Sequence, residues 1–481
     1  MTECEYIVNT FRKAFGQDRS RRICLYGTGR FTKPLLEKLE DFDIVGVADF
    51  GYEKTTWEGY RILTKKEVEE RADILVLIAN PANVHTVYKK VKELPEKINI
   101  YTIEKRDVRV EERFHEKATV EEAVERLRPY AISAEDRRTL ERFSGKLLCG
   151  SGYEVQDMYS FINVFIAPWF VSYFAWVINR IRETGSETVL FSSRDGYLFY
   201  KLFHLLPHCE ALPKAKYFYT SRRCAAVASI ENEQDIKVIA GQMYQGSKEN
   251  FLEKRFGIRV SLKEEELLLD NEALALRYKK NILENAGRER DCLEAYLQKE
   301  GIDKSQNILL FDFMGRGTIQ YCLEKIIGKP LNCLYYFRVR DEGCIERERI
   351  KGVISYSGEG HLYRTKLFTQ RNSALFEAIV TVPHGMVERI GNDGTPLFLE
   401  DGKVDKSYFM EVERACLDYY KEMYAGRQMP LREINLELAD QMAGLVEYDC
   451  IHIDEKVRNC FKVDDPYQSM YTDLFAEGYI K

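Results

Sequence analysis

Three strand-like apolar runs in the middle of the chain each end in a cluster of hydroxyl, guanidinium, carboxylate and glycine residues. Each run is followed by a helical pattern. Strands of this kind end together at the carboxyl edge of an open α/β sheet, where ligands bind. Guanidinium groups, hydroxyls and tight glycine turns suit a phosphorylated ligand. The candidate phosphate-binding residues in the three clusters are Ser193, Arg194, Ser221, Arg222, Arg223, Gly315, Arg316, Gly317 and Thr318.

Two aspartates in the same clusters are the candidate catalytic residues. Asp312 directly follows the apolar run 308–311, which is the setting of a nucleophile or a metal ligand. Asp195 follows the run 188–192 and could act as a general acid or as a metal ligand. Together they could hold Mg²⁺, because one hard cation accepts oxygens from two carboxylates. The alternative for each aspartate is a structural role as a helix cap.

The composition predicts a folded protein of two or three domains. Of 481 residues, 45% are apolar and 31% are charged, which is enough apolar material for large cores. The formal net charge of −6 leaves no excess of Lys and Arg for a phosphate backbone, so no nucleic-acid partner is expected. The 12 cysteines show neither Cys-x-x-Cys pairs nor a zinc-type histidine spacing. This pattern favours reduced thiols and a cytoplasmic protein.

One segment, 161–178, is apolar enough to raise the question of a membrane span. It contains Asn163 and Pro168 and runs directly into Asn179 and Arg180. Its length is marginal for a spanning helix, and the pattern favours a buried helix that packs on the central sheet. We therefore expect no transmembrane segment.

The first hundred residues contain a strand, a glycine turn and a helix of the kind that binds dinucleotides. Gly27 permits the tight turn, and Gly29 permits a phosphate to approach backbone N–H groups at the helix start. A second strand ends at Asp49, where such units place the carboxylate that binds a ribose hydroxyl. A third strand ends at Asn80, the fourth candidate cofactor-binding residue. Thr32 replaces the third glycine of the pattern, and the alternative is a degenerate domain used for assembly.

We therefore expect an α/β protein with two Rossmann-like parallel-sheet domains. Residues 1–106 are expected to form the nucleotide-binding domain, and 107–160 a helical connector. Residues 161–400 are expected to form the central domain, with a helical insertion or cap at 233–300. Residues 401–481 read as a helical C-terminal region that packs on the sheet domain or mediates self-association into a homo-oligomer.

Four motifs resemble a known family, in the order Ser193-Arg-Asp-Gly, Thr220-Ser-Arg-Arg, Asp312-Phe-Met-Gly-Arg-Gly-Thr-Ile-Gln320 and Phe376-Glu-Ala-Ile-Val-Thr-Val-Pro-His-Gly385. They are similar to predicted hydrolases of the haloacid dehalogenase (HAD) superfamily. Those proteins are associated with bacterial cell-surface polysaccharide biosynthesis, often beside or fused to glycosyltransferases. The similarity spans residues 161–398 and implies a HAD-like sheet with a phosphate-transfer ancestry. The N-terminal region resembles the nucleotide-binding domains of sugar-modifying enzymes, and its loop 79–85 is similar to that of nicotinamide-dependent sugar oxidoreductases.

The motifs also depart from the HAD pattern. A HAD phosphatase needs an Asp nucleophile and usually a second Asp two residues later as the general acid. No Asp-x-Asp follows a strand in the central region, and Met314 stands where the acid after Asp312 belongs. The first hypothesis is a HAD-like phosphohydrolase or phosphotransferase that acts on a phosphorylated sugar or sugar nucleotide. The alternatives are a non-catalytic scaffold, which binds a nucleotide sugar and partners a glycosyltransferase, and a nicotinamide-dependent oxidoreductase.

Overall fold

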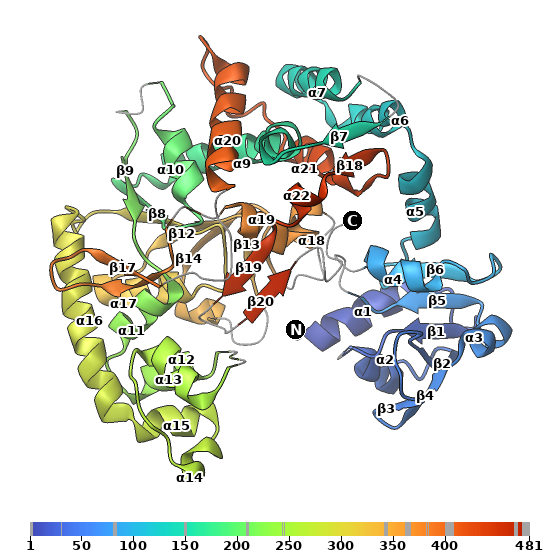
Figure 1. The fold of residues 1–481 in the computed structure, drawn as a ribbon, viewed down its shortest axis with the longest axis horizontal. Helices are drawn as coiled ribbons and strands as arrows, with labels where there is room; N and C mark the ends of the chain where they lie inside the picture. The colour runs from blue at the N-terminus through green and yellow to red at the C-terminus, as the bar shows by residue number, and fades with distance from the viewer. Residues whose placement is uncertain are drawn as a thin grey trace.

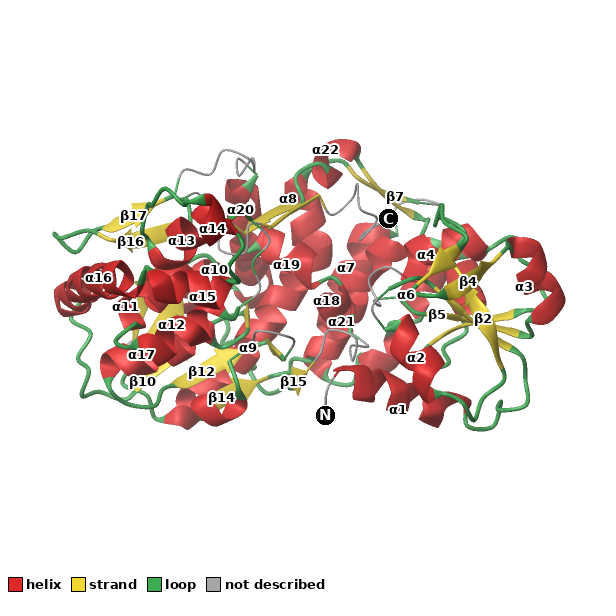
Figure 2. Ribbon diagram, turned by 90° about the horizontal axis from the view of Figure 1, so that it is seen from below, coloured by secondary structure: helices red, strands yellow, loops and turns green. Residues whose placement is uncertain are grey.

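The computed structural model describes residues 3–29, 31–79, 84–148, 152–207, 211–242, 244, 246–340, 345–360, 367–380, 382, 384–399, 408–465 and 470–473. They form a mixed α/β protein with several parallel sheets. The N-terminal sheet and the central sheet lie toward opposite ends of an elongated molecule (Figure 1, Figure 2).

The N-terminal sheet has the strand order β3-β4-β2-β1-β5-β6, and all of its pairs are parallel except β3 with β4. Alternate residues of β1 face opposite sides: Ile23 and Leu25 pack on α1 and α2, whereas Cys24 and Tyr26 face α3 and α4. Helices therefore cover both faces, as the near-continuous apolar strands require. The elements are α1 (Glu3–Phe15), β1 (Ile23–Tyr26), α2 (Thr32–Lys38), β2 (Ile44–Ala48), β3 (Thr56–Trp57), β4 (Tyr60–Leu63), α3 (Lys65–Arg71), β5 (Ile74–Leu77), α4 (Val84–Val91) and β6 (Asn99–Thr102).

The central sheet is entirely parallel and has the strand order β14-β12-β10-β8-β9. The chain runs from β8 outward to β9 and then returns to the other side of β8 at β10. Such a reversal opens a crevice at the carboxyl ends of the two central strands. The elements are β8 (Thr188–Ser192), α10 (Tyr197–Phe203), β9 (Lys214–Phe218), α11 (Arg222–Ser229), β10 (Ile308–Phe311), β11 (Met314–Gly315), α17 (Thr318–Ile327), β12 (Asn332–Tyr335), β13 (Phe337–Val339), β14 (Gly352–Ser355), β15 (Glu359–Gly360), α18 (Phe368–Arg371), α19 (Ser373–Ile379), β16 (Val387–Ile390) and β17 (Pro396–Phe398).

One long helix, Met158–Thr184, is the main apolar support of this sheet; it comprises α8 (Met158–Phe161), a π-helical turn and α9 (Ala167–Thr184). By length and composition it could cross a membrane, but nearly all of its apolar stretch is buried inside the protein. Trp169 packs edge-on against Tyr336, with ring centroids 4.9 Å apart. The buried helix expected from residues 161–178 is confirmed.

The described residues of the segment 233–300 form helices that pack on α11 and α17 of the central domain through a shared apolar core. We name this group of helices the cap. Its elements are α12 (Glu233–Ala240), α13 (Lys248–Phe256), α14 (Glu264–Leu267), α15 (Asn271–Arg277) and α16 (Lys279–Lys299).

The C-terminal region is not purely helical, so that expectation is wrong. Its strand β18 pairs in parallel with β7 of the connector, and Ile451 and Ile453 of β18 alternate inward around exposed His452. This pairing joins two segments that lie about 300 residues apart, which no local pattern reveals. The elements of the two regions are α5 (Val108–Lys117), α6 (Val120–Glu125), α7 (Ala134–Leu147), β7 (Tyr153–Val155), α20 (Phe409–Tyr424), α21 (Leu436–Gly444), β18 (Ile451–Ile453), α22 (Glu455–Arg458), β19 (Lys462–Asp465) and β20 (Met470–Asp473).

Candidate functional site

The three polar clusters predicted from the sequence follow adjacent parallel strands. Strand β8 lies between β9 and β10, so Asp195, Arg222 and Asp312 start from neighbouring carboxyl ends. Adjacent strands are only about 4.8 Å apart. The expected common edge of a single parallel sheet is therefore present.

The loop after β8 is tied to both neighbouring strands. Ser192 Oγ donates to the Phe311 carbonyl at 2.7 Å, and Ser193 Oγ donates to the Thr220 carbonyl at 2.5 Å. The Arg194 N–H donates to Tyr217 Oη at 3.0 Å. The Ser193 hydroxyl is thus engaged with the backbone of the strand-β9 end, so its predicted contact with phosphate would require it to leave that partner.

Asp195 and Asp312 both have raised pKa values at this edge, and the charge of Asp312 acts on Asp195. Burial raises the pKa of Asp195 to about 7, helped by the nearby carboxylates of Asp312 and Glu377 and opposed by Arg194 and Arg222. Burial also raises the pKa of Asp312 to about 6, opposed by Arg222 and helped by Glu377. Two carboxyl groups whose pKa values rise toward neutrality can exchange protons with a substrate near pH 7.

The backbone of the turn after β10 lies close to the carboxyl group of Asp312. Asp312 is 6% exposed, and a Cβ atom on Gly315 would lie 2.6 Å from Asp312 Oδ2. Gly317 has φ 84°, and it precedes the first residue of α17 as its N-cap. A side chain at either position would therefore displace the carboxylate or strain the turn.

Some polar groups at the start of α17 are already hydrogen-bonded within the protein. Thr318 is buried, and its Oγ1 accepts a hydrogen bond from Gln242 Nε2 of the cap segment at 3.4 Å. The Arg316 carbonyl accepts the Ile345 N–H at 3.1 Å, and its side chain is partly exposed. Phosphate binding by the turn from Gly315 to Thr318 stays a prediction. The turn leads into the N-terminus of the ten-residue helix α17, and the positive end of a helix dipole favours an anion there.

The two adjacent arginines of α11 have different environments. Arg222 lowers the pKa of both aspartates, so its charge faces them. Arg223 is buried and forms a two-pronged ion pair with Glu289 of α16, with N–O distances of 2.6 and 2.9 Å. It also donates to the Glu388 carbonyl at 2.7 Å. The guanidinium of Arg223 therefore links α11 to the cap, and its predicted contact with phosphate would require it to leave Glu289.

Ser221 is likewise occupied. Its Oγ accepts the Cys224 N–H at 3.0 Å as the N-cap of α11 and donates to the Val387 carbonyl of β16 at 2.6 Å. This cap holds the β16–β17 hairpin against α11 and uses the hydroxyl that was predicted to bind phosphate. Arg194 keeps capacity for a ligand, since its buried Nε has no hydrogen-bond partner among the described residues.

A pair of carboxylates is the metal-binding arrangement that this edge offers. Among the described residues no group of three or more His, Cys, Asp and Glu side chains has metal-binding geometry. Mg²⁺ usually takes one or two carboxylates and completes its shell with water and substrate phosphate. Asp195 and Asp312 match that donor set by residue type, and a bound cation would offset the cost of burying their charges, which is the main cause of their raised pKa values.

Two residues near the aspartates carry no strand-end signal in the sequence. Glu377 lies on α19, and its position in the sequence is typical of an ordinary helix residue. Tyr217 lies inside β9, where a tyrosine reads as a normal strand residue. Both reach the site from elements whose packing is decided by the whole domain.

In the N-terminal domain, Asp49 closes the glycine turn itself. Its Oδ2 accepts the Thr28 N–H at 3.2 Å and the Thr28 hydroxyl at 2.9 Å, and its Oδ1 accepts the Gly51 N–H at 3.2 Å. Thr32 Oγ1 donates to the carbonyl of Gly27, whose φ is 120°. A ribose hydroxyl at Asp49 would share a carboxylate that is already bonded.

The remaining N-terminal candidates give little support for a cofactor site. A Cβ on Gly29 would meet nothing within 4 Å, so the turn is open there. Helix α2 has only seven residues, which weakens any anion site at its start. Asn80 lies outside the described residues. His85 Nδ1 bonds Glu112 of α5, which fixes the ring at the start of α4.

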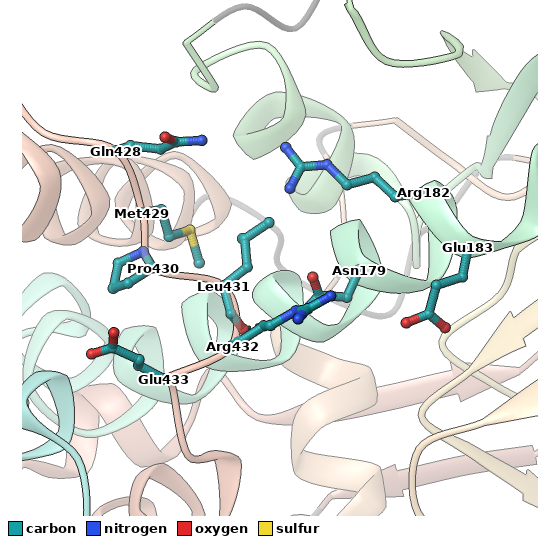
Figure 3. A pocket seen from close by; sticks show the side chains of 9 residues that line it. All are labelled: Asn179, Arg182, Glu183, Gln428, Met429, Pro430, Leu431, Arg432 and Glu433. Carbon is teal, nitrogen blue, oxygen red and sulfur yellow. Dashed lines mark hydrogen bonds between the residues drawn. The ribbon is translucent and has the colours of Figure 1, made fainter.

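Two surface pockets lie away from the aspartate pair. In one, of about 480 Å³, Asn179, Arg182 and Glu183 of α9 face the segment 428–433 (Figure 3). The other, of about 520 Å³, lies between the cap and β16 and includes Arg223 and Glu289. The residues around Asp195 and Asp312 line neither, so the candidate site is defined by its strand ends and charges.

The chain matches no model of a known protein family, and a search of curated proteins finds no significant match.

The raised pKa values predict a loss of stability as the pH rises. The folded protein has a pKa of about 7 at Asp195 and about 6 at Asp312, whereas an unfolded Asp has a pKa of 3.8. At a pH between 3.8 and these values, the folded protein holds protons that the unfolded chain releases. The free energy of unfolding should therefore fall between about pH 4 and about pH 7. Asp195→Asn removes part of this penalty and should stabilise the protein at about pH 8 by about 1–3 kcal/mol, a figure discounted for the partial exposure of Asp195.

Urea unfolding at about pH 5 and about pH 8 measures this effect. The gain should be smaller at the lower pH, where the aspartates are mostly protonated in the folded protein. Asp291→Asn, an exposed position on α16, is the matched control and should change stability little at either pH. A loss of stability in Asp195→Asn at about pH 8 would show that the site prefers the charged aspartate.

Proposed function

We propose that this protein is a HAD-like phosphohydrolase or phosphotransferase that acts on a phosphorylated sugar or a sugar nucleotide. The observation that carries the proposal is the pair of acids, Asp195 and Asp312, at the reversal point of one parallel sheet. Burial is the main cause that raises both pKa values; Asp312 and Glu377 add to the rise at Asp195, Glu377 adds to the rise at Asp312, and the positive charge of Arg222 opposes both. Acid, carboxylate and guanidinium groups at one strand edge are the parts that phosphoryl transfer uses.

The chemistry assigns a separate role to each aspartate. The ionised Asp312 attacks phosphorus, the P–O bond to the sugar breaks, and the departing oxygen takes the proton held by Asp195. Water then attacks the acyl phosphate, gives a proton to Asp195 and releases inorganic phosphate, which restores the Asp312 carboxylate. Arg222 and Arg194 attract the phosphate oxygens. Mg²⁺ held by Asp312 would neutralise charge on the transferred group, and Asp195 would act as a second metal ligand only without the proton that it donates as the acid.

The sheet orders are compatible with two Rossmann-like domains, the central one HAD-like. The resemblance of four motifs to hydrolases of cell-surface polysaccharide biosynthesis suggests a sugar phosphate or sugar nucleotide as substrate and a glycosyltransferase as partner. The nine described cysteines are free thiols, which agrees with a cytoplasmic location.

The test is phosphate release from a panel of sugar phosphates and sugar nucleotides with purified protein and Mg²⁺. We expect turnover of at least one compound and loss of turnover when Mg²⁺ is chelated. Complete inactivity over a broad panel would remove the catalytic proposal and leave the scaffold.

A non-catalytic nucleotide-sugar scaffold is the second candidate, and one observation favours it. Ser193 stands two residues before Asp195, where the HAD nucleophile belongs, and its hydroxyl is bonded to the Thr220 carbonyl. In thermal-shift measurements, a nucleotide sugar at about a hundred times its Kd should add about 2.7 kcal/mol of stability. For the scaffold, that shift should disappear in Asp49→Ala and occur without turnover. Hydride transfer from a nicotinamide cofactor would instead support the oxidoreductase.

A further inference from the structure

A chain of hydrogen bonds connects the loop that carries Asp195 to a histidine far along the sequence. The Arg194 N–H donates to Tyr217 Oη at 3.0 Å, and Tyr217 Oη lies 2.7 Å from His384 Nε2. His384 Nδ1 lies 2.8 Å from the Gly385 carbonyl oxygen. The three linked groups come from the loop after β8, from β9 and from the segment before β16.

Each atom in this chain has one consistent role. The Gly385 carbonyl can only accept, so His384 Nδ1 carries the proton and donates it. Nε2 of the neutral ring is then an acceptor, and the Tyr217 hydroxyl donates its hydrogen bond to it. Burial raises the pKa of the Tyr217 phenol, which keeps that proton in place. The lone pairs of Tyr217 Oη are left to accept the Arg194 N–H.

The histidine ring is held between aromatic side chains. Its centroid lies 4.9 Å from that of Phe398 on β17 and 5.5 Å from that of Tyr219. The Ser221 cap also binds the Val387 carbonyl, so the hairpin cannot move freely from α11. Packing therefore fixes the imidazole, and the imidazole fixes the direction of the tyrosine hydroxyl.

The backbone that donates this hydrogen bond to Tyr217 is strained. Arg194 has φ 69°, in the left-handed region that residues with a Cβ rarely adopt. Such conformations persist where the surroundings enforce them, and they cluster at functional sites. The next residue is Asp195, so the position of its carboxyl group depends directly on this left-handed turn.

Building on the proposed function, we propose that Tyr217 and His384 are positioning residues of the site. Their hydroxyl–imidazole pair holds the Arg194 backbone in its left-handed conformation and thereby places Asp195 against Asp312. Neither residue needs to touch the substrate.

The test compares variants that differ by single functional groups. Tyr217→Phe removes the hydroxyl alone, and His384→Leu removes the acceptor. Either should lower kcat for phosphate release by about tenfold to a hundredfold, with KM changed by less than about threefold, since a small misplacement of a catalytic group costs this much. His384→Gln can place an amide oxygen near the position of Nε2 and should recover part of the loss.

The matched control is Tyr219→Phe. Tyr219 packs on the same histidine, but no hydrogen bond of its hydroxyl is found among the described residues. This variant should keep kcat near that of the unmodified protein. In an Arg194→Gly background, Tyr217→Phe should have little further effect, because glycine adopts positive φ without support. Equal losses in both backgrounds would mean that Tyr217 acts only through packing, and would overturn the proposal.

A second readout separates this inference from the proposed function. The fall in unfolding stability between about pH 5 and about pH 8 reports the environment of Asp195 without any turnover. Tyr217→Phe and His384→Leu should reduce that fall, whereas Tyr219→Phe should not. If the protein has no phosphatase activity but the two variants reduce the fall in stability, the positioning role stands and the proposed enzymatic function does not. If the protein is an active phosphatase but the variants change neither the fall in stability nor kcat, the proposed function stands and the positioning role does not.

Discussion

Asp312→Asn should lower phosphate release from a sugar phosphate by at least about a thousandfold. The amide keeps the size and the hydrogen-bonding shape of the carboxyl group but cannot attack phosphorus or carry the charge that binds Mg²⁺. The fold should persist, because the pKa of Asp312 is already raised by burial and the site gains by losing a buried charge. Initial rates of phosphate release at about pH 7, with circular dichroism of both proteins, measure the effect.

Asp291→Asn serves as the matched control for Asp312→Asn, since it makes the same substitution at an exposed position of α16. It should leave the rate unchanged within about twofold. A residual rate in Asp312→Asn near one tenth of the original would exclude a nucleophilic Asp312. In that case Asp312 would only orient a metal ion or the substrate.

Arg223→Met should destabilise the protein by about 3–5 kcal/mol. The guanidinium of Arg223 bonds both oxygens of buried Glu289, so its removal leaves a carboxylate without its cation inside the protein. Burial raises the pKa of Glu289 against the opposing effect of Arg223, and the variant should lose most stability above neutral pH, where Glu289 would have to ionise. Urea or thermal unfolding at about pH 8 measures the change.

Arg259→Met provides the comparison for Arg223→Met in the same pocket. Arg259 pairs with Glu253 at 2.7 Å, but its side chain is 84% exposed, so its loss should cost less than about 1 kcal/mol. The double variant Arg223→Met/Glu289→Met should recover much of the lost stability, because it leaves no unpaired buried charge. Normal stability of Arg223→Met together with a raised KM would instead return Arg223 to the phosphate site.

The sequence by itself determined where the sheets are and which edge carries polar groups. Short apolar runs ending in Asp, Arg and Gly form buried parallel strands, because strands covered on both faces need apolar residues throughout. Asp312 after β10 and Asp195 after β8 follow from this local pattern. The apolar stretch at 161–178 also indicated the buried central helix, since its polar residues favour burial in the protein over a membrane span, and nearly all of that stretch is buried there.

Only the tertiary structure decided what each polar side chain does. Arg222 and Arg223 are neighbours in sequence, yet successive helix residues point about 100° apart, so one faces the aspartates and the other faces Glu289. The contact between Tyr217 and His384 spans 167 residues and depends on how the β16–β17 hairpin packs on α11. Raised pKa values at Asp195 and Asp312 likewise arise from burial and neighbouring charge, which exist only when distant strands and α19 come together.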